Sequence, residues 1–211
     1  MKSVLKPGEV TSKLLEHLSK LGKRQASFII MLEHILKTDE PMIIETGCMR
    51  EANNYEGDGM STMFWDILCD IKPGAWYHSI DISVANVGFA RSQVTRPECI
   101  IQHDSVKYLS VNRPKKIDLL YLDSYDLDPS NPQPSFLHCL NEFMTCLPLL
   151  SGDALICVDD NILAQDQDGN DIRISKGQYI RQYMDVIGNK PIYDEYQILW
   201  QWKKSMDWSN L

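Results

Sequence analysis

The sequence predicts an α/β fold in which a parallel sheet is covered by helices on both faces. Short apolar runs recur along the chain, most of them preceded by proline or glycine, and helical segments lie between them. Strands that alternate with helices form parallel sheets, because each parallel connection needs a crossover. At 211 residues, of which 44% are hydrophobic, the chain is long enough for one domain with its own core.

The expected elements follow in chain order. Strands are predicted over residues 42–44, 76–82, 98–102, 117–123 and 154–159, with two more within 192–202. Helices are predicted over residues 84–95, 105–110, 135–147 and 177–187, and another begins near Ser61. Residues 1–40 form an N-terminal helical segment, with two apolar patterns separated by Gly22, and residues 41–211 form the main domain. The N-terminal segment is expected to be a lid over the site or a homodimer contact.

The composition limits the classes of binding partner and indicates the cellular compartment. The pI of about 5.1 and the net charge of −8 provide no basic stripe for nucleic acid. No uninterrupted apolar run reaches the ~18 residues that a membrane span needs. The six cysteines include no C-x-x-C pair, so neither disulfides nor a zinc site is expected and a reducing cytoplasm is the predicted location.

The first predicted strand runs directly into a glycine-bearing ligand loop. The strand ends in Glu45-Thr46-Gly47, residues 48–56 form an inserted segment, and Gly57-Asp58-Gly59-Met60-Ser61-Thr62 leads into a helix. Glycines let the backbone approach a ligand, and the hydroxyls of Ser61 and Thr62 can cap the helix or bind that ligand. The pattern predicts a Rossmann-like nucleotide site, although neither the tight G-x-G-x-x-G nor a P-loop is present. The alternative is an ordinary strand-turn-helix with chance glycines.

Acidic residues close the other predicted strands. Asp81 ends the second strand, where a carboxylate accepts ribose hydroxyls, and its alternative role is to cap the next helix. Asp123 and the run Asp159-Asp160-Asn161 end strands four and five. Such hard oxygen ligands favour Mg²⁺ or Ca²⁺, and the alternative is that the two aspartates cap the following turn.

These motifs resemble class I S-adenosylmethionine-dependent methyltransferases. Glu45-Thr46-Gly47, Arg50 and Gly59-Met60-Ser61-Thr62 are similar to the E-T-G-x-x-R…G-x-S-T form seen in small-molecule O-methyltransferases. Asp123 with Asp159-Asp160-Asn161 resembles the cation site of the catechol or caffeoyl type and of the macrocin-like sugar type. The resemblance implies a mostly parallel Rossmann-like sheet that finishes in an antiparallel strand pair.

The resemblance also implies roles for individual residues. S-adenosylmethionine would contact Glu45, Thr46, Gly47, Gly57, Gly59, Ser61, Thr62, Asp81, Asp104, Ser105 and Asp123, with Asp104 toward the adenine amino group. Mg²⁺ would bind Asp123, Asp159, Asp160 and Asn161. The alternative for Asp104 is again a helix cap.

The sequence departs from the catechol-type pattern at the general base. That pattern carries a lysine three residues after the strand-four aspartate, where this chain has Asp126. The base is therefore Asp123, or a metal-bound substrate oxygen that needs no strong base, or His138. The helical spacing of His138 with Phe136 and Leu140 favours packing instead. Residues 166–171 are expected to form a flexible acidic lid.

Together these features predict methyl transfer from S-adenosylmethionine to an oxygen of a small-molecule acceptor, with a divalent cation lowering the pKa of the acceptor hydroxyl. Two alternatives stay open. One is an NAD-linked or nucleotide-sugar enzyme, and the other is a non-catalytic nucleoside-binding module.

Overall fold

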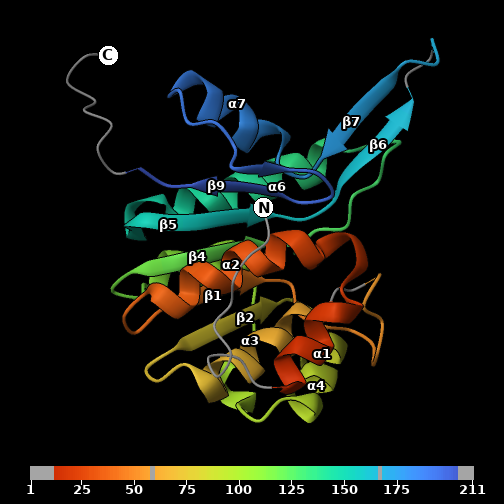
Figure 1. Cartoon of the computed structure of the whole chain (residues 1–211). Helices are drawn as coiled ribbons and strands as arrows, with labels where there is room; N and C mark the ends of the chain where they lie inside the picture. The colour runs from red at the N-terminus through yellow and green to blue at the C-terminus, as the bar shows by residue number, and fades with distance from the viewer. Residues whose placement is uncertain (1–11, 58–59, 166–167, 204–211) are drawn as a thin grey trace.

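The chain folds around one seven-stranded sheet (Figure 1). The computed structural model describes residues 12–57, 60–165 and 168–203, so the predicted site residue Gly59 lies outside the described residues. The strands follow the order β3-β2-β1-β4-β5-β9-β8. Their bounds are β1 Met42–Thr46, β2 Trp76–Asp81, β3 Ile100–Gln102, β4 Ile117–Leu122, β5 Leu150–Val158, β8 Tyr193–Asp194 and β9 Ile198–Gln201.

Strands β1 to β5 are parallel, whereas β9 pairs antiparallel with both β5 and β8. The predicted fold class, including the final antiparallel pair, is therefore confirmed. Strand β5 begins at Leu150, earlier than the predicted position 154, and the β4–β5 register shifts between Ile117 and Leu119. The polar residues 151–153 conceal this start in the sequence, because they interrupt the apolar run.

In the described part of the chain, seven α-helices flank the sheet on its two faces (Figure 1). They are α1 Ser12–Lys20, α2 Gln25–Lys37, α3 Ser61–Ile71, α4 Val84–Gln93, α5 Ser105–Val111, α6 Gln133–Cys146 and α7 Gln178–Val186. Successive residues of a strand point to opposite faces, so Leu119 and Leu120 of β4 enter different hydrophobic clusters. Helices α1 to α4 pack in the first cluster, and α5, α6 and α7 pack in the second.

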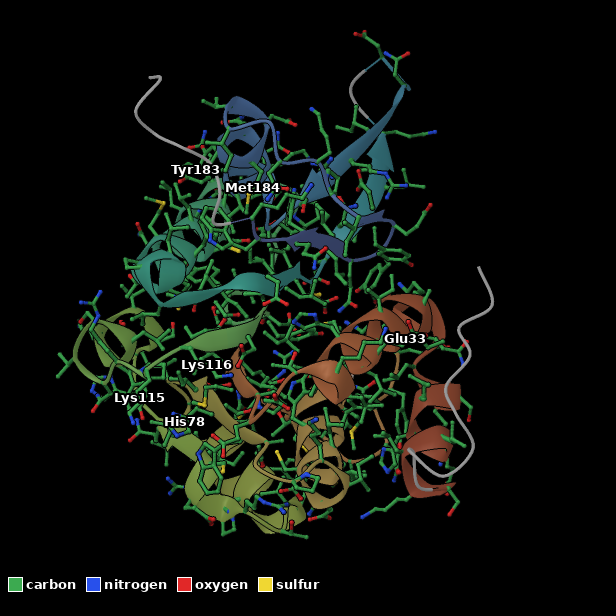
Figure 2. The ribbon with its side chains drawn as sticks, turned by 60° about the vertical axis from the view of Figure 1, so that its left-hand side comes forward. Glu33, His78, Lys115, Lys116, Tyr183 and Met184 are labelled. Carbon is green, nitrogen blue, oxygen red and sulfur yellow. The ribbon has the colours of Figure 1, made fainter. Side chains whose placement is uncertain are left out.

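Helices α1 and α2 belong to the core of this domain. Leu14, Phe28 and Met31 are fully buried in the first cluster, and the Phe28 ring stacks on Trp65 of α3 at 5.2 Å between centroids. Helix α7 packs on the other face, where Met184 is buried and the ring of Tyr183 meets Phe143 of α6 edge-on (Figure 2). Both faces of the sheet are therefore covered, as the sequence predicts.

A two-stranded hairpin follows β5 where the sequence predicts a loop. Strands β6 Asn161–Gln165 and β7 Asp171–Ser175 pair antiparallel and project from the body of the fold (Figure 1). Asn161 lies opposite Ser175 at the base of the hairpin. The chain therefore returns to the end of β5 before α7 begins. Among the described residues, no helix is long and apolar enough to span a bilayer.

Candidate functional site

A cavity of about 190 Å³ opens at the carboxyl ends of β1, β2, β4 and β5. Its walls combine the turn after β1 with charged side chains from the strand ends: Arg24, Glu45, Gly47, Cys48, Arg50, Gly57, Ser61, Asp81, Ile82, Ser83, Asn86, Asp123, Ser124, Asp126 and Asp160. Ligands of open α/β sheets bind at this end of the strands. Seven of the fourteen predicted site residues therefore converge on one cavity, namely Glu45, Gly47, Gly57, Ser61, Asp81, Asp123 and Asp160.

The turn after β1 requires glycine at position 47. The φ of Gly47 is +84°, and a Cβ placed there would lie 2.6 Å from the carbonyl oxygen of Asp123. The Gly47 amide donates to the carbonyl of Ile80 at 2.8 Å. The first predicted loop glycine thus lets the ends of β1, β2 and β4 meet closely beside the cavity.

Glu45 and Thr46 point to opposite faces of β1 and fasten it to its surroundings. The Glu45 carboxyl accepts hydrogen bonds from Thr62 Oγ1 at 2.8 Å and Trp65 Nε1 at 3.1 Å, and from the Ser79 hydroxyl. Thr46 Oγ1 donates to Glu142 Oε2 of α6 at 3.0 Å. Both side chains are buried. Their observed partners are thus protein groups that hold β1 to α3, β2 and α6.

Burial raises the pKa of Glu45 from 4.5 to about 7, and hydrogen bonds from Ser61, Ser79, Thr62 and Trp65 oppose the rise only in part. The folded chain therefore holds a proton here that the unfolded chain has lost. The stabilisation by this proton is complete below pH 4.5 and disappears as the pH rises to about 7.

We expect Glu45→Gln to flatten the decline of unfolding free energy between pH 4.5 and 7, a decline of about 3 kcal/mol in the wild type. Urea titrations across this range measure it. Glu16→Gln is the control, because the pKa of the exposed Glu16 is lowered by its hydrogen bond to Lys20 and its titration falls below the window. Equal slopes for the wild type and Glu45→Gln would show that Glu45 titrates normally.

Asp81 lies between the turn and helix α4. Its Oδ1 accepts from the Ser83 amide at 2.7 Å, and its Oδ2 accepts from Asn86 Nδ2 at 3.1 Å and from the Cys48 amide at 3.3 Å. Ser83, rather than Asp81, caps α4 by accepting from the Asn86 amide at 3.3 Å. Asp81 thus accepts from the backbone just before α4 without being the N-cap residue of that helix, and it also lines the cavity.

A second cavity of about 280 Å³ adjoins the first at Asp81. Its lining is Ile80, Asp81, Ile82, Asp104, Ser105, Ser124, Tyr125 and His138. Asp104 caps α5 by accepting from the Lys107 amide at 2.9 Å, so its alternative role as a helix cap is observed. The two cavities share Asp81, Ile82 and Ser124 in their linings, and we refer to these two neighbouring cavities as the cleft.

The helical spacing of His138 predicted a packed side chain, but His138 lines this second cavity. Its Nε2 lies 3.1 Å from Oε1 of the buried Glu142, which also accepts from Ser124 at 2.8 Å and from the Ser105 hydroxyl. The hydrogen bond to Glu142 raises the pKa of His138 above its ordinary value. Glu142 carries no signal in the sequence, because it lies in mid-helix with no motif around it.

The four predicted metal ligands have partners within the protein. Asp159 is buried and accepts from Arg24 Nη2 at 2.6 Å and from Arg24 Nε at 3.0 and 3.2 Å. Asn161 donates from Nδ2 to Asp194 Oδ1 at 3.0 Å and to the carbonyl of Glu195 at 2.5 Å. The Asp159 oxygens are thus taken up by Arg24, whereas among the described residues Asn161 Oδ1 is buried without a hydrogen-bond partner.

Asp123 and Asp160 share one partner, Lys176, whose Nζ lies 2.8 Å from an oxygen of each. Burial lowers the pKa of Lys176, but the two carboxylates outweigh burial and raise it. Within the described ranges, no group of three or more His, Cys, Asp or Glu side chains is arranged to hold a metal ion. The donor set in this arrangement does not fit a divalent cation. We refer to Asp123, Asp159 and Asp160 as the acidic rim.

Two arginines complete the basic groups of the site, of which Arg24 lies outside the predicted motifs and Arg50 belongs to the E-T-G-x-x-R motif. Arg24 Nη1 donates to the carbonyl of Glu56 at 2.8 Å and Nη2 donates to the carbonyl of Gly57 at 3.1 Å, so Arg24 joins the ligand loop to the acidic rim. Arg50 Nη1 lies 3.2 Å from both oxygens of Asp126 at the exposed mouth. Asp126 therefore has a cationic partner at the position where catechol-type enzymes carry a lysine.

Comparison with solved structures supports the interpretation of the sheet. MycE, a methyltransferase from the mycinamycin biosynthetic pathway in complex with Mg and SAH, aligns with a TM-score of 0.61 over 97% of this chain, at 15% identity. The chain has a methyltransferase fold. It spans 58% of the length of MycE. Cofactor-bound Rv0187 from MTB aligns with a TM-score of 0.53 at 13% identity, over 93% of this chain and 83% of that one. No protein-family model and no curated protein sequence matches the chain.

Proposed function

We propose that this chain binds S-adenosylmethionine and transfers its methyl group to an oxygen of a small polar acceptor. The observation that carries the proposal is the pair of neighbouring cavities at the carboxyl ends of the strands, with Asp81 in the lining of both. MycE, which shares the fold, was solved with SAH and Mg. The cleft matches the two parts of such a ligand, a nucleoside and a charged amino acid.

In this proposal each cavity binds one part of the ligand. The second cavity, with Asp104, Ser105 and His138, would hold the adenine. Asp81 would accept hydrogen bonds from the ribose hydroxyls, as acidic residues at this strand end do in nucleoside sites. The first cavity, with Gly47, Gly57 and Ser61, would hold the amino-acid part.

The charge of the first cavity suits a sulfonium. Four aspartates line it (Asp81, Asp123, Asp126 and Asp160), against the two guanidinium groups of Arg24 and Arg50. A negative field favours a positively charged ligand over a pyrophosphate. The chain would act mainly by aligning the two reactants. When bound, S-adenosylmethionine supplies the methyl group, and the acceptor oxygen loses its proton to Asp123 or solvent.

Ligand binding tests the proposal. S-adenosylhomocysteine is expected to raise the melting temperature by mass action, whereas NAD leaves it unchanged. Asp81→Ala removes the acceptor of the ribose hydroxyls. We expect it to weaken the binding of S-adenosylhomocysteine, as calorimetry measures it, by roughly 1–3 kcal/mol. Asp70→Ala is the matched control, because Asp70 pairs with Arg96 at 2.8 Å and lines neither cavity. Equal shifts with both ligands, or with neither, would refute the proposal.

A further inference from the structure

We propose that Lys176 is the cation of Asp123 and Asp160 in the acidic rim, standing where a divalent metal was expected, and that these two carboxylates bind a hydroxyl-bearing acceptor without a metal. The inference rests on the proposed function for the nature of the acceptor, but the claim about the cation concerns only residues of this chain. Lys176 does not line the cleft, so it acts as a positioning residue through Asp123 and Asp160.

The first support is the arrangement of charge. The side chain of Lys176 is 3% exposed, whereas the side chains of Asp123 and Asp160 are 20% and 25% exposed. The cation thus lies behind the two carboxylates, and the carboxylates face the cleft. A metal between them would have to displace the ammonium into a buried place without a partner, or lie beside another positive charge.

The second support is that the backbone directs Lys176 to this place. The hairpin register sets Asn161 opposite Ser175, so the next residue, Lys176, falls across from Asp160. The Lys176 amide donates to the carbonyl of Asp160 at 3.4 Å. Asp160 itself has φ +52°, a left-handed conformation that brings its side chain back toward the lysine end of the hairpin. The β6–β7 hairpin therefore delivers a fixed cation to the end of β5.

The third support is the hydrogen-bonding capacity that remains at the rim. Asp160 Oδ2 contacts Lys176, and Oδ1 accepts from the Tyr196 hydroxyl at 2.8 Å. Asp123 Oδ1 accepts from Lys176, and within the described part of the chain Asp123 Oδ2 has no donor. A carboxylate oxygen that faces the cleft without a donor accepts a hydrogen bond from a ligand. Such a ligand group carries hydrogen, as a hydroxyl does.

Metal binding tests this inference independently of turnover. Calorimetry and thermal denaturation with MgCl₂, after EDTA treatment, would be compared for the wild type, Lys176→Met and Lys176→Met/Asp160→Asn, each with and without S-adenosylhomocysteine. We expect no Mg²⁺ response in the wild type over the concentrations titrated. Lys176→Met should bind Mg²⁺ with a Kd at least tenfold below the highest concentration tested. The double variant should lose this binding. Lys176→Arg keeps a cation and should remain unresponsive.

The matched control is Lys190→Met, which removes an exposed lysine whose Nζ lies 2.7 Å from Asp185 Oδ1. It should respond to Mg²⁺ no more than the wild type does. Stoichiometric Mg²⁺ binding by the wild type that Asp160→Asn removes would overturn the inference, and so would a folded Lys176→Met that gains no Mg²⁺ affinity. If Lys176→Met does not fold, the comparison of the wild type with Asp160→Asn decides alone. Absence of S-adenosylhomocysteine binding throughout would refute the proposed function, while the ligand-free Mg²⁺ titrations would still decide the role of Lys176.

Discussion

Replacement of Arg24 by methionine is expected to lower the free energy of unfolding by roughly 3–5 kcal/mol, because it leaves a buried carboxylate without its partner. The Arg24 and Asp159 side chains are only 2% and 1% exposed, and Nη2 lies 2.6 Å from Oδ2. Methionine keeps much of the length of the side chain but donates no hydrogen bond. The carbonyls of Glu56 and Gly57 lose their donors as well.

Urea denaturation of wild type and variant measures this loss. The control is Arg173→Met, since the Arg173–Glu195 pair is 36% and 67% exposed and is expected to contribute about 0–1 kcal/mol. Asp159→Asn should also be destabilising, and a double-mutant cycle with Arg24→Met should show coupling between the two positions. A loss below about 1 kcal/mol for Arg24→Met would mean that the buried pair does not form in solution.

The second large effect is expected at the turn after β1. Gly47→Ala should destabilise the chain by roughly 2–5 kcal/mol, since alanine is strained at a positive φ and its Cβ would overlap backbone. The atom it meets is the Asp123 carbonyl oxygen, 2.6 Å away, which belongs to the end of β4 and cannot rotate aside. Because the turn and Asp123 both line the first cavity, binding of S-adenosylhomocysteine should fall with stability.

Two other glycines separate strain from overlap. Gly188 has φ +72° with no atom within 4 Å of an added Cβ, so Gly188→Ala tests strain alone and should destabilise by about 1–2 kcal/mol. Gly88 lies inside α4 and is also unobstructed, so Gly88→Ala should stabilise by about 0.5–1 kcal/mol. Equal losses of unfolding free energy for Gly47→Ala and Gly188→Ala would show that the overlap of the added Cβ with the Asp123 carbonyl oxygen does not destabilise the chain.

Local signals in the sequence were sufficient for the sheet and for much of the cleft. Each interior strand is a short apolar run with a turn residue before it, and in a parallel sheet the polar residues that follow such runs must share one edge. Asp81 and Asp123 could be placed there from this rule alone. Gly47 could be identified because the turn into a ligand loop needs a residue without a β-carbon.

The cations of the site lacked such signals. Arg24 lies between Lys23 and Gln25, where a basic side chain in a helical pattern ordinarily faces solvent. Its burial depends on Asp159, which no local pattern connects to it. The position of Lys176 depends on the hairpin register, and the polar residues 166–171 favoured a loop in the sequence. The sequence therefore predicted the acidic residues of the site but not Arg24 and Lys176, the cations that pair with them.

The contact between Arg24 and Asp159 also has a consequence for the order in which the chain folds. The two residues are 135 positions apart in sequence. Their approach closes a long loop, whose entropy must be lost before the ion pair contributes anything. The end of β5 must already stand in the sheet, with α2 packed beside it, when the pair forms. Interactions that form after the transition state slow unfolding without accelerating folding. We therefore expect Arg24→Met to accelerate unfolding more than it slows folding, as stopped-flow kinetics in urea would measure.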